Sequence, residues 1–155
     1  MKKFFAVIAC LSVSLLLVQS LHSEEEAKEK QLLCPVSGKA VNMEQKVAYK
    51  NAEVYFCCGN CLAAFKEDPS KFAVKANHQL VASGQYEEVK CPLSGGKLNP
   101  DTAVTVADVE VTFCCNNCKG KVEGEADGDA KLALVFSDAA FEKGFAKKKA
   151  KRARD

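Results

Sequence analysis

Two clusters of cysteines dominate the chemistry available to this chain. Each cluster holds three cysteines within five residues, in the sequences CCGNC and CCNNC, and one further cysteine lies upstream with 22 residues in between. The eight residues are Cys34, Cys57, Cys58 and Cys61, and Cys91, Cys114, Cys115 and Cys118. Thiols at these spacings are typical of soft-metal sites, disulfide frameworks and thiol redox centres.

The second set of cysteines repeats the first at a constant distance of 57 residues. An ungapped alignment of residues 34–61 with residues 91–118 gives 13 identities in 28 positions. Identity at this level over one fixed period indicates a duplicated structural unit. The chain is therefore predicted to contain two tandem modules.

Each module is predicted to contain a turn, a β-hairpin and a helix, in that order. The turns are CPVSG and CPLSG at residues 34–38 and 91–95, with proline and glycine suited to turn conformations. Alternating apolar residues predict hairpins within 47–56 and 104–113. A helix follows the first cluster, and a strand at 131–136 and a helix from 139 to about 149, capped by Ser137-Asp138, are expected after module two. The predicted fold class is α+β.

A cysteine in a turn that faces two cysteines at the start of a helix brings three thiolates to one point. The turn offers a sulfur atom together with backbone amides, and the helix N-terminus stabilises negative charge. Two such centres are predicted. Their ligands are Cys34, Cys57 and Cys61, and Cys91, Cys114 and Cys118.

The pattern Cys-x22-Cys-x3-Cys, together with CPVSG, VYFC and CLAAFKEDPSKF, resembles the TRASH and YHS domains. These are related treble-clef-like modules associated with heavy-metal trafficking, resistance and sensing. The resemblance covers residues 34–72 and 91–118. It implies the same three metal ligands in each module, and two small tandem treble-clef-like folds.

One position departs from the family pattern. Many relatives have a second cysteine in the turn, where this chain has Ser37 and Ser94. Cys58 and Cys115 are therefore candidates for a fourth ligand, and a three-thiolate site with an open position is the alternative. Three thiolates suit Cu(I) or Hg(II), whereas four suit zinc. His78, in the segment between the modules, is a further candidate to close one site.

The first residues predict export. A short basic segment, an apolar run and then Glu24-Glu25-Glu26 form the layout of a signal peptide. We expect a periplasmic or extracellular protein, with an uncleaved membrane anchor or lipidation at Cys10 as alternatives. Without Lys2 and Lys3 the 22 basic residues become 20 against 20 acidic ones, so the net charge is near zero and no nucleic-acid partner is expected. The expected partners are a metal ion and a metal-transport or membrane protein.

The predicted division of the chain is a signal peptide at 1–23, a linker at 24–33, module one at 34–77, a linker at 78–90, module two at 91–136, and a C-terminal helix with a basic tail at 137–155. Disulfides are the main alternative use of the cysteines, because export leads to an oxidising compartment. Cys-x-x-Cys at a helix start also allows thiol redox chemistry. No other catalytic motif is present in the sequence, so a non-catalytic protein is expected.

Overall fold

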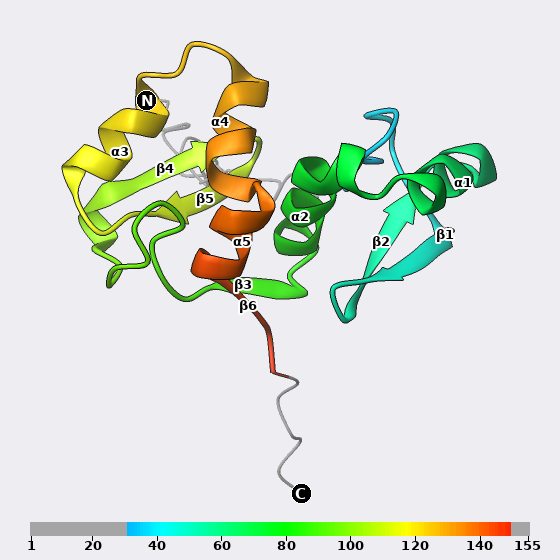
Figure 1. Cartoon of the computed structure of the whole chain (residues 1–155), viewed down its shortest axis with the longest axis horizontal. Helices are drawn as coiled ribbons and strands as arrows, with labels where there is room; N and C mark the ends of the chain where they lie inside the picture. Colours follow the sequence, from blue (N-terminus) through cyan, green and yellow to red (C-terminus); the bar gives the residue numbers. More distant parts are fainter. Residues whose placement is uncertain (1–30, 150–155) are drawn as a thin grey trace, which may run out of the picture.

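The structure is a computed structural model that describes residues 31–149 (Figure 1). The fold is α+β, with three two-stranded antiparallel sheets and two similar cysteine-rich modules. Figure 1 shows the hairpin β1–β2 and helix α1 on one side of the molecule and the hairpin β4–β5 and helix α3 on the other, with α2 between them. The predicted signal peptide and the last six residues of the basic tail lie outside the described residues.

Module one begins with the turn at residues 34–38 and the hairpin of β1 (Asn42–Tyr49) and β2 (Ala52–Phe56). Lys50 and Asn51 connect the strands with φ of 48° and 61°, the left-handed pair that matches the twist of a two-residue hairpin. Helix α1 (Gly59–Glu67) follows at once. Because β2 alternates buried and half-buried side chains, Val54 and Phe56 face the core and Tyr55 faces outward.

Module two repeats this plan closely. Strands β4 (Ala103–Val106) and β5 (Val109–Thr112) form the hairpin, and helix α3 (Asn116–Glu123) follows the second cysteine cluster. A short 3₁₀ turn, η2 (Pro100–Thr102), precedes β4. Ala107 and Asp108 in the hairpin turn have φ of 46° and 62°, close to the values at the same positions in module one. The duplication seen in the sequence is therefore a duplication of backbone conformation.

The segment predicted as a linker at 78–90 instead contains regular structure. After the 3₁₀ turn η1 (Ser70–Phe72), helix α2 (Ala73–Ala82) runs to residue 82, and strand β3 (Tyr86–Glu88) follows. Ala76, Asn77, Gln79 and Leu80 on α2 are buried. Helix α2 is thus part of the protein's core.

The strand predicted at residues 131–136 is wrong, because these residues belong to helix α4 (Gly128–Phe136). The side chain of Asp127 accepts a hydrogen bond from the amide of Asp129 and so caps the helix N-terminus. Leu132, Val135 and Phe136 then have the spacing of one helix face, and Val135 and Phe136 are fully buried. The apolar pattern of residues 131–136 by itself fits a strand as well as a helix, and the capping residue Asp127 indicates the helix.

The C-terminal helix is shorter than predicted. Helix α5 (Asp138–Gly144) ends at Gly144, and strand β6 (Phe145–Lys147) follows. Strand β6 pairs antiparallel with β3, so that Glu87 faces Ala146 at the centre of the pair. This pairing joins the end of each module to the end of the other.

One continuous core joins the modules. Helix α2 of the first half packs against α4 of the second, and the buried cluster includes side chains from both hairpins. Its largest fully buried members are Phe56, Phe65, Phe113, Phe136, Phe141 and Leu80. Since equivalent elements pair with each other, as α2 with α4 and β3 with β6, the two halves meet as two copies do in a symmetric dimer.

Two buried amide side chains on α2 connect it to other elements, Asn77 across the junction and Gln79 within module one. Asn77 donates from Nδ2 to the carbonyl oxygen of Phe136 and to Oδ1 of Asp138, both at 2.9 Å. Gln79 accepts from the amide of Tyr55 at 2.7 Å and donates to the carbonyl oxygens of Tyr55 and Leu33 at 2.9 and 2.8 Å. Because Leu33 precedes the first turn cysteine, Gln79 connects the core to the first cysteine site.

Candidate metal centre

The structure brings the predicted cysteines together in two groups of three. Within each group every sulfur atom lies within 4.8 Å of the other two. Site 1 consists of Cys34, Cys57 and Cys61, and site 2 of Cys91, Cys114 and Cys118. Across residues 31–149 these are the two groups of cysteine, histidine and acidic side chains with the proximity that a metal ion needs.

The turn places the first ligand of each site. The amide of Gly38 donates to the carbonyl of Cys34 at 2.8 Å, and the amide of Cys34 donates to the carbonyl of Lys39 at 2.7 Å. Gly38 has a φ of 70°, in the region that favours glycine. Site 2 has the same pair of bonds, and Gly95 has a φ of 74°. Backbone amides of this turn also hydrogen-bond the turn thiol, which lies 23 and 27 residues before its two partners in the sequence.

The start of a helix places the other two ligands. Cys58 is the N-cap of α1, with an extended backbone at φ −161° and ψ 167°, and Cys115 caps α3 with nearly the same angles. The ligand before each cap therefore lies just beyond the end of the strand, and the ligand three residues after the cap lies in the first helical turn. Both then point to the turn cysteine.

The sulfur spacing fits a metal ion. The distance from Cys57 Sγ to Cys61 Sγ is 3.6 Å, and that from Cys114 Sγ to Cys118 Sγ is 3.7 Å. Zn–S bonds of about 2.3 Å in a tetrahedron put the sulfur atoms about 3.8 Å apart. A disulfide needs an S–S distance of about 2.05 Å. All eight cysteines of the described residues are free.

Cys58 and Cys115 lie beside the triads. Cys58 Sγ is 3.7 Å from Cys57 Sγ, and Cys115 Sγ is 3.6 Å from Cys114 Sγ. Neither sulfur atom lies within 4.8 Å of all three sulfur atoms of its site. In this geometry three thiolates form each centre, and a fourth thiol is adjacent to one edge.

The turn serines have a role that the sequence reasoning missed. Ser37 Oγ lies 3.2 Å from Cys57 Sγ, and Ser94 Oγ lies 3.1 Å from Cys114 Sγ. A serine hydroxyl is a poor ligand for a soft metal but a good hydrogen-bond donor to a thiolate. The sequence signal for this role was that serine occupies the same turn position in both repeats.

The thiols in each site differ strongly in acidity. Burial raises the pKa of Cys34, but the Ser37 hydroxyl and backbone amides outweigh it and lower the value to about 7. Burial and the neighbouring thiols raise the pKa of Cys61 to about 12. Site 2 repeats this, with a pKa of about 7 for Cys91 and about 12 for Cys118. The turn thiol therefore ionises more readily than the thiol in the helix, and a cation bound at the site would displace protons from the triad.

The adjacent thiols are acidified by the helix start. The backbone amide of Cys61 and the neighbouring thiols lower the pKa of Cys58, and the amide of Cys118 has the same effect on Cys115. Amides at a helix N-terminus stabilise thiolate charge in this way. Each site thus has one readily ionised thiol outside the triad.

His78 is placed away from both sites. It lies on α2, where Nε2 is 2.9 Å from the carbonyl oxygen of Ala107 and the ring packs edge-on against Phe136. It belongs to neither group of metal-binding side chains. The contact with Ala107 ties the second hairpin to α2.

Comparisons with models of known protein families, with curated protein sequences and with solved structures each give no match. Among the described residues no helix has the length and apolar character that a membrane crossing requires. No relative therefore indicates the chemistry of the two sites, which follows from their own residues.

Proposed function

We propose that this protein is an exported, non-catalytic carrier of soft metal ions, with Zn(II) and Cu(I) as its cargo, and that its modules are TRASH/YHS-like. The observation that supports this most strongly is the duplication of one geometry. The two triads have the same spacing, the same turn, the same helix start and the same serine contact. A chain that merely needed apolar filling would not require cysteine at the same four positions of both modules.

The donor set favours a soft ion. Three thiolates stabilise Cu(I) in a trigonal site and bind Zn(II) when a fourth ligand completes the tetrahedron. Cys58 and Cys115 are near enough to one ligand each to supply that fourth sulfur. In this proposal the ion passes to a metal-transport or membrane protein in the export compartment.

Thiol redox chemistry is a second candidate function. Cys58 is exposed with a lowered pKa, and Cys61 three residues later has a raised one. That contrast is typical of a nucleophilic and a resolving thiol. A redox protein would reduce a disulfide substrate catalytically, whereas a metal carrier would not.

Metal stoichiometry in matched variants tests the proposal. We expect the whole chain, purified without oxygen and titrated with Zn(II), to bind two equivalents, one for each triad. Cys34→Ser and Cys91→Ser should each remove one equivalent. Cys58→Ser should keep both equivalents, because the triad still holds the ion and a water molecule can take the fourth position. Binding of no ion by the reduced wild-type chain, or equal loss in all three variants, would refute the proposal.

A further inference from the structure

The two sites share their ligands but not their surroundings: the turn of site 2 is covered and its adjacent cysteine half-buried, whereas the turn of site 1 is open and its adjacent cysteine exposed. We propose that site 1 exchanges its ion with a thiol-bearing acceptor through Cys58, whereas site 2 retains its ion and stabilises the fold. The inference rests on the proposed metal binding and assigns different roles to the two sites.

The tip of the site 2 turn is covered, and the tip of the site 1 turn is open. A methyl group on Gly38 would meet no atom within 4 Å, whereas one on Gly95 would lie 3.2 Å from Cγ of Lys143. Lys143 Nζ also donates to the carbonyl oxygen of Leu93 at 3.1 Å. The end of helix α5 therefore lies over the turn that provides Cys91.

The last residue of helix α5, Gly144, also packs against the backbone of the site 2 turn. A methyl group on Gly144 would lie 2.7 Å from Cα of Pro92, so that the two backbones are in close contact. The carbonyl oxygen of Gly144 accepts from the amides of Val89 and Lys90 at 2.8 and 3.1 Å. Site 1 has one comparable connection, from Gln79 to Leu33. Opening site 2 thus requires movement of the shared core.

The strand that leads into each helix is also held differently. In module two the hydroxyl of Thr102 donates to the carbonyl oxygen of Phe113 and accepts from its amide, directly before Cys114. In module one the ladder is interrupted between Asn42 and Lys46, and residues 43–45 bulge out. Gln45 at the end of this bulge contacts the first turn of α1, 3.7 Å from the position of a Cβ on Gly59.

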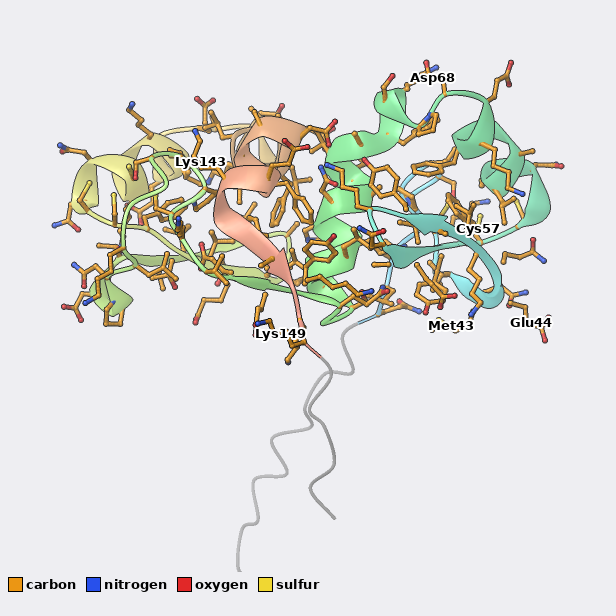
Figure 2. The ribbon with its side chains drawn as sticks, turned by 60° about the horizontal axis from the view of Figure 1, so that its bottom comes forward. Met43, Glu44, Cys57, Asp68, Lys143 and Lys149 are labelled. Carbon is orange, nitrogen blue, oxygen red and sulfur yellow. The ribbon has the colours of Figure 1, made fainter. Side chains whose placement is uncertain are left out.

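The bulge lies at the same end of the molecule as site 1 and exposes a methionine (Figure 2). Asn42 pairs with Phe56, the residue before Cys57, and Met43 comes next in the bulge with 55% of its surface exposed. Figure 2 shows Met43, Glu44 and Cys57 at the same end of the molecule. Cys58 is exposed, while its counterpart Cys115 is half-buried. The thiol beside the triad is therefore accessible at site 1 and partly covered at site 2.

Exchange at site 1 is a ligand substitution without change of oxidation state. The Cys58 thiolate binds the ion as one triad cysteine leaves and takes up a proton. An acceptor thiol then binds the ion and loses its proton as a second triad cysteine leaves and takes one up, and further acceptor thiols displace the remaining cysteines in the same way. Cys58 leaves last as a thiolate, and the proton of the acceptor thiol that displaces it replaces the one taken up in the first step. Each bond formed to the metal replaces one broken bond, so that charge and protons balance.

The test is the release of Zn(II) from the fully loaded whole chain to excess glutathione, followed with a colorimetric zinc indicator. We expect two phases, one equivalent each. Cys34→Ser should remove the fast phase, and Cys91→Ser the slow one. Cys58→Ser should slow the fast phase about tenfold and leave the slow phase, which belongs to the other site, unchanged.

Lys143→Ala provides a test that does not depend on removing a ligand. It should accelerate the slow phase about tenfold, since it uncovers the turn of site 2 without changing the triad. Lys121→Ala, on an exposed face of α3, is the matched control and should leave both phases unchanged. Release of both equivalents in one phase, a fast phase that belongs to site 2, or no effect of Lys143→Ala would overturn the inference while the proposed function stands. Failure to bind any ion would overturn both.

Discussion

Replacement of Glu88 by glutamine should stabilise the protein above neutral pH. In module one Gln79 accepts from the amide of Tyr55 and donates to its carbonyl. In module two the equivalent residue, Thr112, donates its amide to Oε2 of Glu88 at 2.8 Å, and Oε1 of Glu88 is buried without a partner. Glutamine, like a protonated glutamic acid, carries the donor that an ionised carboxylate lacks.

The size and sign of this effect follow from the acidity of Glu88. Burial raises the pKa of Glu88 from 4.5 to about 7. The negative charges of Cys91 and Glu110 also raise it, and the hydrogen bond from the amide of Thr112 lowers it. Because the folded value is the higher one, the neutral acid stabilises the fold fully below about pH 4.5, and this stabilisation is lost as the pH rises through about 7. The whole shift corresponds to about 3 kcal/mol, which solvent screening of this partly exposed group reduces to about 1–2 kcal/mol.

Urea unfolding of the wild type and Glu88→Gln at about pH 5 and about pH 8 measures the effect. The variant should gain about 1–2 kcal/mol over the wild type between the two pH values. Titration of the thiols that do not interact with Glu88 affects both proteins equally and cancels in the difference, whereas the interaction with Cys91 is part of the effect measured. Glu87→Gln, on the exposed side of the same strand, is the control and should show no such gain. A pH-independent difference between Glu88→Gln and the wild type would refute the reasoning.

Three further predictions concern the core and the sites. Gln79→Ala should destabilise the fold by about 3 kcal/mol in urea unfolding, because it leaves three backbone groups without their partner; a loss below about 1 kcal/mol would contradict this. Gly144→Ala should cost about 1–3 kcal/mol through its clash with Pro92, while Gly120→Ala, in open space on α3, should stabilise by about 0.5–1 kcal/mol; equal effects in thermal unfolding would be inconsistent with the packing. Zinc affinity in chelator competition should fall on acidification below about pH 7, where protons compete for the thiolate of Cys34; affinity that stays constant down to about pH 5 would argue against thiolate ligands.

The candidate sites were predictable because their signal is local and repeated. The constant offset between Cys34 and Cys91, and between the clusters, requires two equal environments, and the structure has them. Hairpins with Lys50-Asn51 and Ala107-Asp108 at their turns follow from the period-two alternation on either side. The α+β fold class is confirmed.

The centre of the molecule was not predictable in the same way. Beyond residue 61 the two repeats no longer share a recognisable sequence, although α2 and α4 occupy equivalent places. The buried faces of these helices meet each other, so that polar residues such as Asn77 and Gln79 find partners in distant parts of the chain. A single sequence does not contain that pairing. The capping side chain of Asp127 was the local signal that distinguishes helix from strand at 131–136.

Metal content and free-thiol count, measured together on the protein recovered from its native compartment without added metal or reductant, test the central claim most directly. The account predicts two equivalents of zinc or copper, with thiols that become titratable once the ion is removed by a chelator. Protein that carries no metal and shows no titratable thiols until it is reduced would contradict it, and would assign the cysteines to disulfides.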